Sequence, residues 1–496
     1  MSGPGVAMLE IRGESADLPV VLDAIVSAIG KIVDVHDDNG GTARERRLRL
    51  GGGGRARLSA GPPVDAKAAA SGTFTVALVL EEPAALPPEQ AKAVMRTLQR
   101  VPFTGLEMRA LSEQMPLTAE LPHFLPPGCL ADVAPVLTVH HMTDFLTLVG
   151  AVQGLGVPPE AITVLDKGYR YRHTQRVDAH LTAQGITVWP WQRAAEALAD
   201  HVQRAAALGR RGLLIDDGGY TLPVLLRERP DLIAAFCGLV EQTISGITRL
   251  EPWPKLPLPI LSVAESRLKA TIESYGIAEA AITNLRRLLP EEKLEGQPAL
   301  VIGYGRIGEQ IAAALSARRM QVAVYDHQLV QLIAAHERGY RTDRRLSRLL
   351  REHRPMLIIG STGRTSLRGE HAAAIMRNCY LVSTTSRDRE FAIAELEEDA
   401  VEVTDEGVLG TRLRLRSGVS VTLVGDGYPI NFHHAESLPN SSADLILASL
   451  IVGAATLAAP GHDFMPGHNV AATNRALEGC GLLERYYARF GPGVAR

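Results

Sequence analysis

A glycine-rich stretch, Val301 to Gly308, has the most specific chemical meaning in this sequence. It follows an apolar run over 300–302 that predicts a strand, and it precedes a predicted helix over 309–315. A second apolar run, 321–325, ends at Asp326. Three glycines have the G-x-G-x-x-G spacing of a βαβ dinucleotide site: Gly303, Gly305 and Gly308.

Each part of this pattern has a physical task. The first glycine makes a tight turn, the second lets the backbone approach a pyrophosphate, and the third lets the helix pack on the strand. The free N–H groups of the helix N-terminus face the phosphates. Asp326 would accept hydrogen bonds from a ribose diol, which favours NAD over NADP. The alternative is a tight strand-to-helix turn in another α/β domain, but strand, helix and acid together favour dinucleotide binding.

Composition limits the class of protein. The length of 496 residues suggests about three domains of roughly 150 residues each. The net charge is −3, from 52 basic and 55 acidic residues, so no bulk field attracts nucleic acid. We expect the cluster Arg44, Arg46, Arg47 and Arg49 to be a solvated strand or loop rather than a nucleic-acid patch.

Cysteine usage and the termini indicate a cytoplasmic protein. Cys129, Cys237, Cys379 and Cys480 are far apart, which fits a reducing compartment and predicts no metal site. The N-terminal residues lack the basic and apolar regions of a signal peptide. The apolar run Leu445 to Ala459 is shorter than the roughly 20 residues of a spanning helix, so we expect a buried helix and no membrane association.

Residues 1–112 are expected to form a small appended α+β module without catalytic residues. Its predicted elements are a helix over 20–33, a strand over 74–80 and a helix over 88–98. The Gly-, Arg- and Ala-rich stretch 37–71 is expected to be a mobile loop or a loose hairpin. From residue 113 onward, short strands alternate with helices, which predicts two doubly wound Rossmann-like α/β lobes.

Between about residues 135 and 480 several motifs occur in one order. They are His141-Met142-Thr143, Ile215 to Gly219, Gly238 to Gly246, Glu265-Ser266 with Lys269 and Glu273, the glycine-rich loop with Asp326, Ser361-Thr362-Gly363, and Ile430-Asn431. This ordered set resembles the S-adenosyl-L-homocysteine hydrolase family, which has a Glu in place of Asp326. The resemblance does not extend to residues 1–112.

The resemblance implies a division into domains. Residues 113–275, completed by 437–480, would form a substrate-binding α/β domain. Residues 276–436 would form an NAD-binding Rossmann domain, and residues 481–496 a C-terminal tail. The family forms tetramers, so a homo-oligomer, a dimer or a tetramer, is expected.

The resemblance also implies a reaction that starts with oxidation. Tightly bound NAD⁺ takes a hydride from C3′ of a nucleoside, and the resulting ketone acidifies the C4′ hydrogen. A base removes that proton and the C5′ substituent is expelled. The hydride then returns, so the cofactor is regenerated in each cycle.

Four residues would carry this chemistry. Lys269 would assist deprotonation of the 3′-hydroxyl, and Glu273 would face the same way one helical turn later; the alternative is an ordinary surface ion pair. Asp217 and His141 resemble the family's acid/base pair near C4′ and C5′. The alternatives are a turn-capping Asp and a satisfied histidine at a strand end. Because His140 is adjacent, the assignment between the two histidines stays open.

The binding residues also follow from the resemblance. Substrate contacts are expected at Thr143, Gln242 and Leu438. Cofactor contacts are expected at Thr243, Ile244, Ser245, Ser274, Gly303, Gly305, Arg306, Ile307, Gly308, Asp326, Gln331, Ser361, Thr362, Gly363, Thr384, Thr385, Ser386 and Asn431.

Three departures from the family pattern affect substrate recognition. Gln242 replaces a Glu that binds ribose hydroxyls, and Ser386 and Leu438 replace two histidines. The main hypothesis is therefore a nucleoside lyase that removes water from an adenine nucleoside and gives a 4′,5′-unsaturated product. A divergent hydrolase is the close alternative. A non-catalytic NAD-binding regulator and a simple nicotinamide dehydrogenase that releases NADH are the others.

Overall fold

The computed structural model describes residues 5–38, 42, 44–62, 72–169, 171–385, 390–433, 440–462 and 464–491. The chain divides into two compact units. The first comprises residues 1–131, 141–164 and 173–189, and the second comprises residues 132–140, 165–172 and 190–496.

The first unit contains a five-stranded antiparallel sheet in the order β1-β5-β4-β3-β2. Its strands are β1 (Gly5–Arg12), β2 (Val35–Asp37), β3 (Glu45–Leu50), β4 (Arg55–Gly61) and β5 (Thr73–Leu80). Helix α1 (Asp17–Gly30) contributes Leu22 and Ile25 to a core shared with the sheet. The stretch predicted as a mobile loop or loose hairpin contains the regular hairpin β3–β4, in which buried Leu48 alternates with exposed arginines.

The second sheet has seven strands in the order β20-β11-β10-β9-β6-β7-β8. They are β6 (Val133–Thr138), β7 (Thr163–Asp166), β8 (Thr187–Pro190), β9 (Arg211–Asp216), β10 (Phe236–Glu241), β11 (Pro259–Ser262) and β20 (Gly467–His468). Every residue of β6 and β10 is buried, which explains their continuous apolar sequences. The direction of strand progression reverses between β6 and β9, which pair in parallel. Such a reversal is where open α/β sheets bind ligands.

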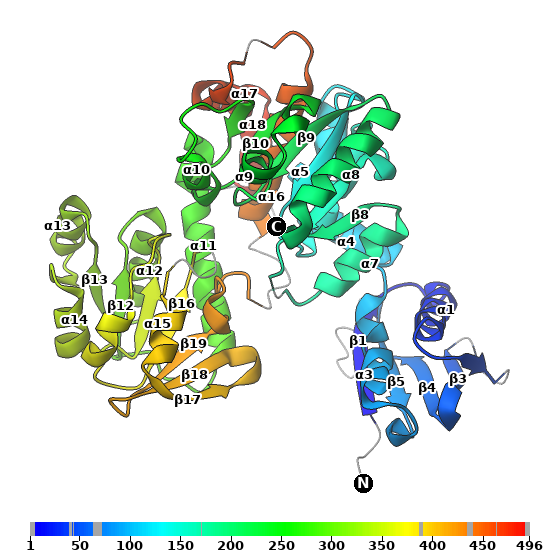
Figure 1. The fold of residues 1–496 in the computed structure, drawn as a ribbon, viewed down its shortest axis with the longest axis horizontal. Helices are drawn as coiled ribbons and strands as arrows, with labels where there is room; N and C mark the ends of the chain where they lie inside the picture. The colour runs from blue at the N-terminus through cyan, green and yellow to red at the C-terminus, as the bar shows by residue number, and fades with distance from the viewer. Residues whose placement is uncertain are drawn as a thin grey trace. The chain divides into compact units, whose positions relative to one another are not determined.

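The third sheet has eight strands in the order β14-β13-β12-β15-β16-β19-β18-β17 (Figure 1). They are β12 (Pro298–Ile302), β13 (Gln321–Tyr325), β14 (Arg341–Thr342), β15 (Leu357–Gly360), β16 (Cys379–Ser383), β17 (Ala400–Asp405), β18 (Gly410–Leu415) and β19 (Ser420–Val424). The strands from β14 to β19 pair in parallel, and β18 and β17 extend the edge antiparallel. Here the reversal lies between β12 and β15.

Helices cover both faces of this third sheet. Val301 belongs to one buried cluster with residues of α11 and α12, whereas Leu300 and Ile302 belong to another with residues of α14. Alternate side chains of a strand point to opposite faces, so the sheet is doubly wound. The predicted α/β class is therefore confirmed.

The remaining helices are α3 (Pro88–Met95), α4 (Gly105–Gln114), α5 (Pro116–Phe124), α6 (Asp144–Gly154), α7 (Thr174–Ala183), α8 (Ala194–Ala207), α9 (Leu222–Glu228), α10 (Ile244–Leu250), α11 (Arg267–Leu288), α12 (Arg306–Ala317), α13 (Leu329–Glu337), α14 (Leu346–His353), α15 (Ile393–Glu398), α16 (Asn440–Ala458), α17 (Val470–Gly479) and α18 (Leu482–Phe490). Helix α11, the long green helix of Figure 1, packs on both α12 and α16.

The apolar helix α16 packs against β10. By length and composition its segment Ser441–Ala458 could cross a membrane, although the sequence run had been expected to be too short. In the structure 72% of this segment is buried inside the protein, as in the core helix of a folded domain.

Candidate active site

A cavity of about 600 Å³ lies in the second unit, at the carboxyl ends of strands from both parallel sheets. Asp217 follows β9 and Gln242 follows β10, while Gly305 follows β12 and Ser361 follows β15. Both topological reversals therefore contribute to one cavity, which is where the fold is expected to bind ligands.

Glycine is required at three positions of the loop after β12, for a different steric reason at each position. Gly303 has a φ of +96°, and a Cβ there would lie 2.8 Å from Thr362 Cγ2. A Cβ on Gly308 would lie 1.9 Å from the carbonyl oxygen of Gly303, so only glycine lets α12 start this close to the strand. Gly305 lines the cavity, and no described atom lies within 4 Å of where its Cβ would be. That open space is what an approaching pyrophosphate needs.

Asp326 supports this loop from the end of β13. Its carboxylate accepts hydrogen bonds from the backbone N–H of Tyr304 and of Gln328, both at 2.7 Å. Each carboxylate oxygen keeps a further lone pair that can accept from a ribose hydroxyl.

Glu390 is a buried acceptor that holds the loop after β15. Its carboxylate accepts from Thr362 N–H at 2.9 Å and from the hydroxyls of Thr362, Ser366 and Thr385 at 2.8, 2.6 and 2.9 Å. Burial raises the pKa of Glu390, and the hydrogen bonds from Ser366, Thr362 and Thr385 oppose that rise. Glu390 was not among the site residues predicted from sequence, although it fixes two cofactor-side segments.

Replacing Glu390 by alanine is expected to lower the free energy of unfolding by about 2 kcal/mol, because several part-buried donors lose their acceptor. Urea unfolding followed by circular dichroism measures the change. Glu397→Ala, at an exposed position of α15, is the matched control. Equal stability of the two variants would show that the hydrogen bonds to Glu390 do not stabilise the fold.

The side-chain oxygen of Asn431, a buried acceptor, fits the amide of NAD. Asn431 is 2% exposed, and its Oδ1 has no hydrogen-bond partner within the described residues. Because an unpaired buried amide oxygen is costly, this atom is suited to accept a hydrogen bond from a ligand amide. Asn284 Nδ2 on α11 donates to the backbone oxygens of Ile430 and Asn431 and holds the segment in place.

Lys269 and Glu273 form an ion pair that faces the cavity. The Ser266 hydroxyl caps α11 by accepting from the backbone N–H of Lys269 at 3.2 Å. Lys269 Nζ lies 3.1 Å from Glu273 Oε2 and also donates to the backbone oxygen of Gln242. Burial raises the pKa of Glu273, while the charge of Lys269 opposes that rise. Lys269 is 9% exposed, so the alternative of an ordinary surface ion pair does not apply.

Asp217 belongs to a second buried cluster of charges. Lys167 Nζ lies 3.1 Å from Asp217 Oδ1, and His140 Nε2 lies 3.3 Å from Asp217 Oδ2. Lys167 Nζ and His140 Nε2 are 3.2 Å apart. Burial by itself would raise the pKa of Asp217, but the charges of Lys167, His140 and Lys269 together lower it. Asp217 is therefore ionised at neutral pH.

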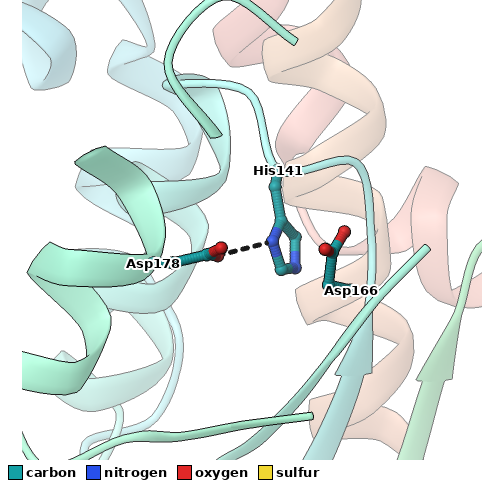
Figure 2. A group of neighbouring side chains, drawn as sticks. All are labelled: His141, Asp166 and Asp178. Atoms are coloured by element: carbon teal, nitrogen blue, oxygen red, sulfur yellow. Dashed lines mark hydrogen bonds and ion pairs between the residues drawn. The ribbon is translucent and has the colours of Figure 1, made fainter. Parts of the chain in front are cut away.

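His140, and not His141, lines the cavity beside Asp217. The fully buried ring of His141 stacks on Phe145, and its Nδ1 lies 2.9 Å from Asp178 Oδ1 of α7 (Figure 2). The two neighbouring side chains therefore have different surroundings, and a shift of one position exchanges the two histidines.

Sequence reasoning missed Lys167 and the aromatic residues around it. Lys167 Nζ lies 5.4 Å from the ring centroid of Tyr169 and 5.5 Å from that of Tyr220. The ring of His140 stacks on Phe432 with centroids 3.8 Å apart. Lys167 directly follows β7, so the rule that ligand sites lie beyond the carboxyl ends of parallel strands would have indicated it.

Two further buried carboxylates have structural partners. Asp216 accepts from the backbone N–H groups of Tyr220 and Thr221 at 2.8 and 2.7 Å, and from the Thr221 hydroxyl at 2.6 Å. Glu241 accepts from the N–H of Gly218 at 3.1 Å and from Thr243. Burial raises the pKa of both carboxyls. They hold the backbone beside Asp217 and Gln242.

The structure places most predicted site residues along the cavity. The lining contains Asp217, Gln242, Thr243, Ile244, Ser245, Lys269, Glu273, Ser274, Gly305, Arg306, Ile307, Ser361, Thr362, Gly363, Thr384, Thr385 and Asn431. The predicted residues that the described lining does not contain are His141, Thr143, Gly303, Gly308, Asp326 and Gln331. Ser386 and Leu438 lie outside the described residues.

Comparison with known proteins gives matches over this part of the chain. Residues 273–360 match the NAD-binding domain of the D-isomer specific 2-hydroxyacid dehydrogenases. S-inosyl-L-homocysteine hydrolase of Methanopyrus kandleri is 26% identical over 300 residues, which are 59% of this chain and 69% of that protein. Adenosylhomocysteinases of Thermoplasma acidophilum and Gloeothece citriformis are 27% and 28% identical, over 48% and 50% of this chain and 58% of each relative.

Among solved structures, a dipicolinate synthase from Bacillus halodurans aligns with a TM-score of 0.42 and 13% identity, over 67% of this chain and 100% of that one. The relatives identified by sequence confirm the resemblance that the ordered motifs indicate. The matched domain also establishes that the chain carries an NAD-binding domain.

Proposed function

The chain is a divergent relative of the adenosylhomocysteinases, and from this premise we propose that it is an NAD-dependent nucleoside lyase. It would remove water across C4′ and C5′ of an adenine nucleoside and release a 4′,5′-unsaturated nucleoside. The observation that carries the proposal is the presence of two buried charge clusters, Lys269–Glu273 and Asp217–His140–Lys167, on one cavity with the NAD loop.

Bound NAD⁺ supplies a hydride acceptor for a secondary alcohol. Lys269 is suited to assist deprotonation of that alcohol, because its Nζ is held by Glu273 and by the Gln242 carbonyl and keeps one N–H for the alcohol oxygen. The Asp217–His140 pair is suited to take the C4′ proton. Both groups are buried, so proton transfers are shielded from bulk water.

The recognition residues favour a lyase over the parent hydrolase. Gln242 lines the cavity where the family has a ribose-binding acid, and its Oε1 has no hydrogen-bond partner within the described part of the chain. A neutral amide can accept a ribose hydroxyl but cannot act as a base. Lys167 adds a cation beside Asp217 that the motif comparison did not anticipate.

A mass-spectrometric assay in deuterated water tests the proposal. Purified protein with NAD⁺ is offered adenosine, inosine and S-adenosylhomocysteine. The expected result is deuterium at C4′ of the nucleoside and a product lighter by one water. Conversion of S-adenosylhomocysteine to adenosine at roughly 1 per second or more would instead identify a hydrolase. Exchange with none of them, despite bound NAD, would favour the regulator.

A further inference from the structure

We propose that Lys167 is the proton donor to the C5′ oxygen, so that this chain expels a hydroxyl group as water. The inference rests on the proposed lyase function and assigns the one step for which Lys269 and Asp217 are not suited. Hydroxide is a poor leaving group, and protonation of the departing oxygen by a positioned acid removes that obstacle.

The geometry gives Lys167 a free proton to donate. Its side chain is 3% exposed and lines the cavity. One of its three N–H donors is directed to Asp217 Oδ1 at 3.1 Å, and a second is directed to His140 Nε2 at 3.2 Å when that nitrogen carries no proton. The third donor is therefore available to a ligand oxygen. The faces of Tyr169 and Tyr220 lie beside the ammonium group and stabilise its charge without removing its protons.

The proton balance closes within the cluster. The C4′–H bond breaks, its electron pair forms the C4′=C5′ double bond, and the C5′–O bond breaks with its pair on oxygen. That oxygen takes a proton from Lys167 Nζ and leaves as water. The proton taken from C4′ by the Asp217–His140 pair then returns to the neutral amine across the 3.2 Å between His140 Nε2 and Lys167 Nζ.

The competing explanation is that Lys167 only neutralises Asp217. An arginine distinguishes the two roles, because a guanidinium keeps the positive charge but does not release a proton in proteins. Chloride, the leaving group of 5′-chloro-5′-deoxyadenosine, needs no protonation, so its elimination gives a second test of whether Lys167 donates a proton. Deuterium exchange at C4′ measures oxidation and deprotonation, whichever leaving group the substrate carries.

The experiment compares the wild type, Lys167→Arg and Lys167→Met with adenosine and with the 5′-chloro nucleoside. Lys255→Arg, at an exposed position, is the matched control. We expect Lys167→Arg to lose water elimination by about 100-fold or more while C4′ exchange and chloride elimination stay within a few-fold of the wild type. Lys167→Met is expected to lose water elimination to the same extent as Lys167→Arg. For Lys167→Arg, the amount of bound NAD and the thermal unfolding temperature are expected to equal those of the wild type.

Two results would overturn the assignment. Water elimination by Lys167→Arg at the wild-type rate would make the lysine a counter-ion. Equal loss of exchange, chloride elimination and water elimination would make it part of the deprotonation site or of the fold. If the wild type itself shows no C4′ exchange with any nucleoside, the proposed function fails. That outcome differs from the two results that would overturn the role of Lys167 alone.

Discussion

Lys269→Met loses hydride transfer from the nucleoside by about 1,000-fold or more, whereas NAD stays bound. Methionine keeps the length of the side chain but has no N–H to assist deprotonation of the hydroxyl, and positioned acid–base catalysis contributes factors of this size. The substitution also leaves Glu273 buried without its cation, 3.1 Å from where Nζ stood, so its carboxyl takes up a proton more readily. Single-turnover absorbance of the reduced nicotinamide measures the rate.

The control for this substitution is Lys293→Met, at an exposed position after α11. It removes one lysine charge outside the cavity and is expected to retain the wild-type rate. Reduced nicotinamide formed by Lys269→Met at a rate within tenfold of the wild type would show that another group takes the hydroxyl proton. Loss of bound NAD would indicate instead that the helix start had been disturbed.

Gly308→Ala destabilises the NAD lobe by about 3 kcal/mol or more, since its Cβ would lie 1.9 Å from a backbone oxygen that cannot rotate away. Gly305→Ala is the matched variant. It meets no described atom within 4 Å and has a φ of −73°, so the fold is expected to keep its stability. Its methyl group would enter the cavity and weaken NAD binding by at least about tenfold.

Thermal unfolding and NAD titration of both glycine variants measure the two effects separately. The expected pattern is loss of stability for Gly308→Ala and loss of affinity alone for Gly305→Ala. Equal loss of stability in both would mean that the loop does not have the backbone path described here. Unchanged NAD affinity in Gly305→Ala would place the pyrophosphate elsewhere.

The glycine-rich loop could be predicted from sequence because its information is local. The glycine spacing, the strand before it and Asp326 lie within one βαβ unit, so turn geometry and helix packing determine which residues are required. The same holds for Lys269 and Glu273, which share a face of α11 because they are four positions apart.

The substrate side depends on contacts between distant segments, which spacing does not encode. Lys167, His140 and Asp217 follow three different strands, and only the strand order brings them together. The histidine assignment failed to resolve for a related reason, because one position along an extended segment reverses the direction of a side chain. Strand β10 was not predicted as a strand, although its residues Phe236 to Val240 are those of a buried parallel strand.

The two reversals of strand order that meet at the cavity place the NAD loop and the Lys167 cluster on different sets of strands. The glycine-rich loop and the segments held by Glu390 come from the ends of β12, β15 and β16, whereas the groups beside Lys167 come from the ends of β6, β7, β9 and β10. Under the proposed function, the residues after those four strands are therefore the ones to vary in order to change the leaving group while the NAD loop is kept.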